Sequence, residues 1–114
     1  MQIPHKVLVK PGISYFVAYV DKFDDKDQLG YCLDKNSDMG SRTILLKLGM
    51  SETLTAKIFI HEVFHAIEFE YNIKIPHQLI RDLEEPMFYL FTRNPKAFVS
   101  SFSGAKRSNK KRKK

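Results

Sequence analysis

The chain has 114 residues with a formal net charge of +6, and 43% of its residues are hydrophobic. This length supports one domain with a hydrophobic core and excludes two domains, and no apolar stretch is long enough to cross a membrane. The single cysteine, Cys32, excludes an internal disulfide and a thiolate metal cluster, so we expect it to be a small buried apolar residue.

The first half of the chain predicts a small sheet. Stretches rich in β-branched and aromatic residues alternate with turn-forming stretches, among them Pro11-Gly12 and the acidic segment 21–28. A short polar loop joins the last two stretches, so the sheet should be at least partly antiparallel. We expect three or four strands, drawn from residues 7–9, 13–20, 30–34 and 43–48.

The second half predicts two helices. Ser51 is a suitable N-cap, and apolar residues and histidines recur after it with helical spacing. Asn72 and the extended segment behind it end this helix, and a second helix is expected from about His77 to Thr92. The predicted fold class is therefore α+β, with a small sheet followed by two helices.

The last nine residues, KRSNKKRKK, hold seven positive charges and no negative one, which leaves −1 for residues 1–105. Like charges repel, and this run has no apolar residue to anchor it. We therefore expect one domain over residues 1–105 and a disordered basic tail over 106–114, suited to weak contact with nucleic acid or only to solubility. The N-terminus lacks signal-peptide features, so we expect a cytoplasmic protein without membrane contact.

The stretch HEVFHAIEFE, residues 61–70, places two histidines four apart with a glutamate directly after the first. On a helix, positions i and i+4 share one face, so His61 and His65 can bind one metal ion. Glu62 then lies beside the ion, where it can act as a general base. Glu68 and Glu70 are expected at the solvated end of this helix.

A catalytic zinc site takes three protein ligands and leaves one position for water, so another ligand must come from elsewhere. His77 follows a loop and is a less well placed candidate. Glu85 stands 20 positions after His65, a separation at which a returning helix brings a carboxylate back to the histidines, and we predict it as the third ligand. Pro86 removes a helical hydrogen bond behind it, which leaves the choice between Glu84 and Glu85 open.

These residues resemble the gluzincins, the thermolysin-like zinc peptidases, whose HExxH motif is followed by a glutamate ligand on the next helix. HEVFHAIEFEYNIKI and LEEPMFYLFTRNP are still more similar to the minigluzincins and small phage-type relatives, over roughly residues 30–95. The resemblance implies Zn²⁺ on His61, His65 and Glu85, with Glu62 as the base. It also implies that an edge strand, GYCLD at 30–34, pairs with an extended peptide or protein substrate.

The large gluzincins also use a His or Tyr to stabilise the oxyanion, and the candidates here are Tyr71, Tyr89, His77 and Arg81. Two functions follow from the sequence. The first is a zinc-dependent metallopeptidase in which Glu62 is the general base. The alternative is a non-catalytic, metal-stabilised binding module that contacts nucleic acid through the basic tail.

Overall fold

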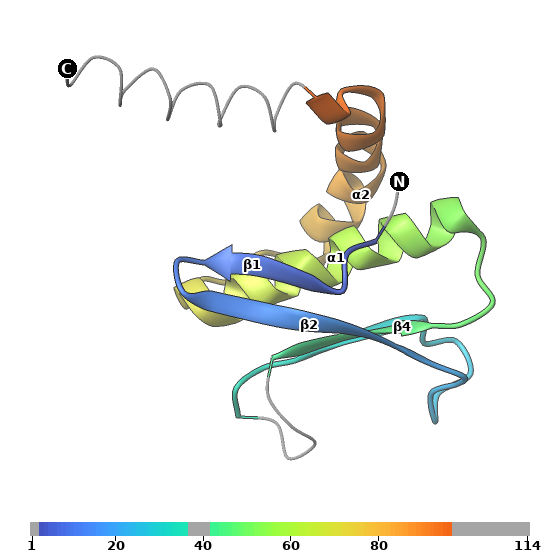
Figure 1. Cartoon of the computed structure of the whole chain (residues 1–114), viewed down its shortest axis with the longest axis horizontal. Coiled ribbons are helices and arrows are strands. Elements are labelled where there is room, and N and C mark those ends of the chain that lie inside the picture. Colours follow the sequence, from blue (N-terminus) through green and yellow to red (C-terminus); the bar gives the residue numbers. More distant parts are fainter. Residues whose placement is uncertain (1–2, 37–41, 97–114) are drawn as a thin grey trace.

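The computed structural model describes residues 3–36 and 42–96. Four strands, β1 (Lys6–Lys10), β2 (Ile13–Val20), β3 (Gly30–Leu33) and β4 (Thr43–Lys47), precede two helices, α1 (Glu52–Tyr71) and α2 (His77–Arg93) (Figure 1). The predicted α+β fold is confirmed. The predicted basic tail, residues 106–114, and the end of the predicted domain lie outside the described residues. In the part of the chain that is described, neither helix combines the length and apolar character of a membrane span.

The four strands form one sheet in the order β1-β2-β4-β3. β1 pairs with β2 and β3 pairs with β4 in antiparallel fashion, as the short connections predict, whereas β2 and β4 run parallel. After β2 the chain leaves free the position beside β2, which β4 takes later, and forms β3 on the far side of that position. This path makes β3 an edge strand.

Helix α1 lies across one face of the sheet (Figure 1). Side chains alternate between the two faces of a strand, and those beneath the helix are apolar. They form the core with two residues of α1, and its buried members are Tyr15, Cys32, Ile44, Leu46, Phe59 and Ala66. Cys32 is buried as predicted, and burial raises the pKa of its thiol, which keeps the thiol protonated.

Both ends of α1 are capped by the residues that the sequence indicates. The Ser51 side chain accepts a hydrogen bond from the Leu54 amide at 3.1 Å. At the other end Asn72 adopts a left-handed conformation, with φ 52°, and its amide donates to the Glu68 carbonyl. The helix therefore begins and ends where expected.

Helix α2 packs mainly against α1 and projects away from the sheet (Figure 1). It runs from His77 to Arg93 although Pro86 lies inside it. Ile80 is the residue of α2 that is fully buried. The position of α2 thus depends on its contact with α1 and not on the sheet.

Glu70 ties the end of α1 to the sheet. Its carboxylate accepts hydrogen bonds from the Tyr15 hydroxyl at 2.6 Å and from Arg42 Nε at 2.9 Å, while Lys10 Nζ donates to its backbone carbonyl at 3.0 Å. The Glu70 side chain is largely buried, so the expectation that it lies at a solvated helix end is wrong. The hydrogen bond from Arg42 holds the pKa of Glu70 below its ordinary value.

Replacing Glu70 by glutamine should lower the free energy of unfolding at pH 7 by about 1–2 kcal/mol, because Tyr15 and Arg42 lose a charged acceptor. The folded-state pKa is lowered, so the stabilisation is present above the ordinary carboxyl pKa and is lost as the pH falls through the lowered value. Urea unfolding from about pH 7 to pH 3 measures both effects. Asp24→Asn, in the β2–β3 loop, is the control, and an equal effect there would contradict a specific role for Glu70.

Candidate metal centre

Three histidines from two helices meet beside strand β3. His61 and His65 lie one turn apart on α1, as their spacing predicts, and His77 is the first residue of α2. The Nε2 atom of His61 lies 3.2 Å from Nε2 of His65 and 3.1 Å from Nε2 of His77. The three ligand atoms all lie within 4.8 Å of one another.

A carboxylate contacts the other ring nitrogen of each α1 histidine. His61 Nδ1 contacts Glu84 Oε2, and His65 Nδ1 lies 2.7 Å from Glu68 Oε1. An ionised carboxylate only accepts hydrogen bonds, so Nδ1 is the donor in each contact, and the tautomer that fits has its Nε2 lone pair directed at the cluster. Carboxylate partners of this kind orient metal-ligating histidines and raise their basicity.

Lone pairs that converge in this way repel one another unless a proton or a cation lies between them. His77 can donate one proton toward His61, but His61 and His65 would then still face each other with two acceptors at 3.2 Å. His77 is exposed, but desolvation by the groups around it, followed by the charge of nearby His61, lowers its pKa, which favours its neutral form. The donor set therefore fits a cation shared by three imidazoles.

Glu62 lies next to this cluster and is 6% exposed. It borders the two cavities that the histidines also line. Burial, followed by the nearby Glu84 carboxylate, raises the pKa of Glu62 to about 7. Glu62, which the sequence predicts as a base, thus lies beside the histidines with a pKa raised toward neutral pH.

The structure does not bring Glu85 to the histidines, which contradicts its expected position. The Glu85 side chain is 72% exposed and forms an ion pair with Lys57 at 2.5 Å. Glu84 faces the cluster instead, and His77 supplies the third converging nitrogen. One signal for His77 was present in the sequence, because the chain holds few histidines and this one opens the helix that returns to α1.

Glu68 also departs from the expectation of a solvated position. One of its carboxylate oxygens contacts His65, and the other accepts a hydrogen bond from the Ile75 amide at 2.8 Å. Its spacing of three residues from His65 places both on the same side of the helix. Glu68 therefore orients a histidine and also fixes the connection that leads to His77.

A cavity of about 700 Å³ opens beside the cluster, between the β2–β3 loop and both helices. Its lining includes Glu62, His61, His77 and Arg81. Of the four candidates for an oxyanion stabiliser, Arg81 and His77 line this cavity. Tyr71 lies instead under Lys10, and Tyr89 lies beside Arg93 on α2.

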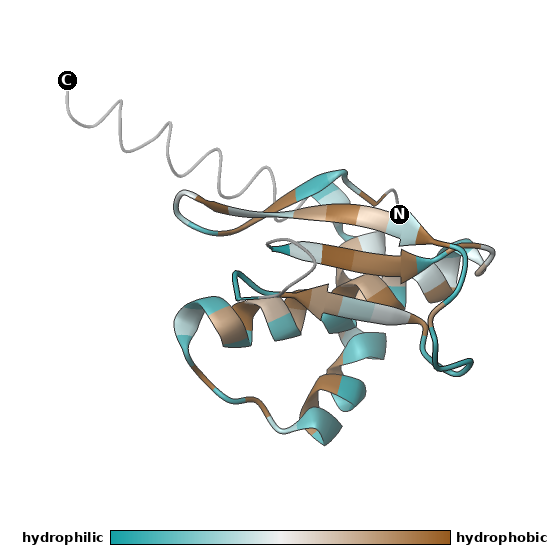
Figure 2. Cartoon of the chain, turned by 90° about the horizontal axis from the view of Figure 1, so that it is seen from below, coloured by the Kyte–Doolittle hydropathy of each residue, from teal (hydrophilic) through white to brown (hydrophobic). Residues whose placement is uncertain are grey.

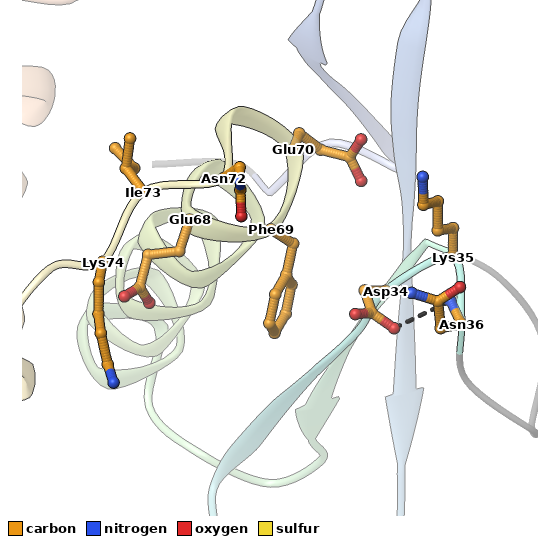
Figure 3. Close-up of a pocket in the computed structure, with 9 residues that line it drawn as sticks. All are labelled: Asp34, Lys35, Asn36, Glu68, Phe69, Glu70, Asn72, Ile73 and Lys74. Carbon is orange, nitrogen blue, oxygen red and sulfur yellow. Dashed lines mark hydrogen bonds between the residues drawn. The ribbon is translucent and has the colours of Figure 1, made fainter.

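Two further cavities extend this space along β3. One borders all three histidines and Glu62 and also reaches Phe69. The next, of about 510 Å³, shares Phe69 and lies at the end of α1, where Figure 3 shows Glu68 and Lys74 on one side and Asp34 to Asn36 on the other. We call this row of three neighbouring cavities, along edge strand β3 and α1, the groove, and the histidines lie near its middle.

Comparison with models of protein families, with curated proteins and with solved structures gives no match to this chain.

Gly30 sets the distance between β3 and α1. A Cβ atom at this position would lie 2.6 Å from Ile58 Cγ2 and 3.1 Å from Glu62 Oε2. We expect Gly30→Ala to destabilise the fold by about 1–3 kcal/mol, because the strand or the helix must move. Urea unfolding measures this change.

The matched control is Gly30→Ala in an Ile58→Ala background, where the nearest obstructing atom is absent. The cost of the alanine at position 30 should be smaller there than in the wild-type background. An unchanged cost would show that the contact with Ile58 does not limit the approach of the strand.

Proposed function

We propose that this chain is a zinc-dependent peptidase. The observation that carries the proposal is the convergence of three imidazole Nε2 atoms, two of them with carboxylates on Nδ1, next to Glu62, a largely buried residue that borders the same cavities as the histidines. A purely structural cation site needs no additional acid at this position. The motif's resemblance to zinc peptidases supports the same activity.

The residues that would hold the ion are His61, His65 and His77. Tetrahedral zinc with Zn–N bonds of about 2.0–2.1 Å separates its ligand nitrogens by about 3.3 Å. The observed separations from His61 of 3.2 Å and 3.1 Å are close to this value. Glu84 contacts Nδ1 of His61, on the far side of the ring from the other donors, which favours an orienting role for it over ligation.

A bound zinc ion would polarise the peptide carbonyl and acidify a water molecule. Glu62 would take a proton from the attacking water as its oxygen bonds to the carbonyl carbon. The same carboxyl group would then give the proton to the leaving amine as the C–N bond breaks. Arg81, a cation that lines the cavity with Glu62, would stabilise the negative charge that develops on the carbonyl oxygen.

The edge position of β3 supports a polypeptide substrate. β3 pairs only with β4 in the described sheet, and its other side borders the groove that contains the histidines. An extended peptide can add to such an edge through backbone hydrogen bonds. The scissile bond would then lie over the histidines and Glu62.

Metal content tests the ligand set. We expect about one zinc per chain in protein purified without chelator, and loss of this zinc in His61→Ala, His65→Ala and His77→Ala, because three protein ligands are needed. Glu84→Ala and Glu68→Ala should keep the site but bind zinc about 10- to 100-fold more weakly. Elemental analysis and competition with a chelator measure these effects.

Glu85→Ala is the matched control, because Glu85 is the neighbour of Glu84 and points into solvent. It should bind zinc like the wild type. Zinc retained in His77→Ala but absent from Glu84→Ala would replace His77 by Glu84 as the third ligand. Wild-type protein that takes up no zinc would refute the metal centre itself.

Glu62→Gln tests catalysis separately from metal binding. The amide keeps the size of the side chain but cannot accept the proton, so zinc should be retained while peptide hydrolysis falls by at least about 100-fold. Arg81→Gln should lower kcat, again with zinc retained. Cleavage of an unfolded protein and of a peptide library provides the measurement, with Glu85→Gln as the control.

Equal cleavage by wild type and Glu62→Gln would exclude Glu62 as the base. If zinc binds and the wild type cleaves no substrate in a broad panel, the proposal gives way to a metal-stabilised binding module. In that module the basic tail, residues 106–114, would contact nucleic acid electrostatically.

A further inference from the structure

The sheet face opposite α1 carries no helix in the described ranges 3–36 and 42–96 (Figure 2). The strand register places a set of side chains side by side on this face. We call it the outer face and define it by Lys6, Leu8, Phe16, Tyr31, Leu45 and Lys47. The histidine cluster lies on the α1 side of the sheet, although Tyr31, on the edge strand, also borders the cavity beside the histidines, and Lys47 also borders a cavity at the start of α1.

The outer face exposes large apolar and aromatic groups. Leu8 is 67% exposed, Phe16 60% and Tyr31 49%. Figure 2 views the molecule from the side of this face, with the sheet in front of α1. Contiguous exposed apolar surface of this kind marks interaction sites in proteins.

The charges on this face have one sign. None of the four strands contains Asp or Glu, whereas Lys6 is the cross-strand partner of Phe16 and Lys47 ends β4. Neither lysine forms an ion pair with an acid in the described part of the chain. In the loop between β2 and β3, Asp25 and Asp27 line the cavity on the helix side. An anionic partner therefore meets no acidic side chain of these strands.

We propose that the outer face binds single-stranded nucleic acid, with Phe16 and Tyr31 stacking on bases and Lys6 and Lys47 contacting phosphates. Exposed aromatics together with lysines on a sheet are the elements that sequence-tolerant binding of single strands requires. A second copy of the chain fits less well, because a two-fold contact would bring the lysines of both copies into one interface where the strands supply no acidic partner.

The spacing of the two aromatics favours a single strand over a duplex. Phe16 lies on β2 and Tyr31 on β3, and β4 lies between these two strands. Along the strand direction the two aromatic residues are offset by two residues. Strand spacing and rise place them about 12 Å apart. Bases stacked in a duplex rise by only about 3.4 Å per step, so Phe16 and Tyr31 would take unpaired bases that are spread apart.

Fluorescence anisotropy with a labelled oligothymidine of about 12 nucleotides tests this binding on the full chain. Phe16→Leu and Tyr31→Leu keep the face apolar but remove the aromatic ring, and each should weaken binding by at least about fivefold. Tyr89→Leu is the matched control, since Tyr89 on α2 is also 60% exposed, and its affinity should be unchanged. Lys6→Gln should lower the slope of log affinity against log salt by about one, and the leucine variants should keep the slope.

A second readout gives a positive signal. The chain contains no tryptophan, so Tyr31→Trp places one reporter on the outer face and Tyr89→Trp places one on α2. Oligothymidine should quench the first and leave the second unchanged, and a duplex of equal length should quench the first less.

Leucine variants that bind as tightly as the wild type would overturn the proposal, and would assign any binding to the basic tail. The affinity of a full chain with Lys110, Lys111, Lys113 and Lys114 changed to glutamine measures how much the basic tail contributes to binding. Absence of nucleic-acid binding, together with a dimer in sedimentation that Phe16→Leu weakens, would assign the outer face to a second copy instead. None of these results depends on zinc or on peptidase activity.

Discussion

The close contact between α1 and edge strand β3 fixes the position of every group in the candidate centre. At Gly30 the strand comes so near the helix that no side chain fits between Gly30 and Ile58. This approach buries Glu62, raises its pKa and closes one wall of the groove that holds the histidines. A wider gap would expose more of Glu62 to water and would separate the edge strand from the histidines.

The ends of α1 hold that contact in place. Ser51 caps the first turn, and at the last turn Asn72 and the bonds from Glu70 to Tyr15 and Arg42 anchor the helix to the sheet. The histidines lie between these two anchors, so the helix cannot rotate without breaking one of them. α2 has no comparable attachment to the sheet, and its orientation relative to the histidines comes through α1.

Sequence reasoning works here where the signal is local. Strand and helix positions, both caps of α1 and the pairing of His61 with His65 all follow from periodicity and from residues close in sequence. The parallel pairing of β2 with β4 does not, because alternation shows which face a residue takes and not which strand lies beside it. Tertiary contacts alone decide that order.

The wrong prediction of Glu85 as the third ligand has a similar cause. Successive residues on a helix differ in direction by about 100°, so the helical phase decides whether Glu84 or Glu85 faces α1. Sequence separation from His65 cannot give that phase. Glu70 was expected in solvent for a related reason, since its partners Tyr15 and Arg42 are distant in sequence.

His77 stands at the junction where the two helices meet, and this has a consequence for the mechanics of the domain. α2 buries little of its own surface, with Ile80 as its fully buried residue. An ion shared by His61, His65 and His77 would act as a cross-link between two elements that otherwise share a small interface, in a chain with no disulfide available. Part of the free energy of ion binding would then stabilise the packing of α2 against α1. The groove would take its final shape only when the ion joins the two helices.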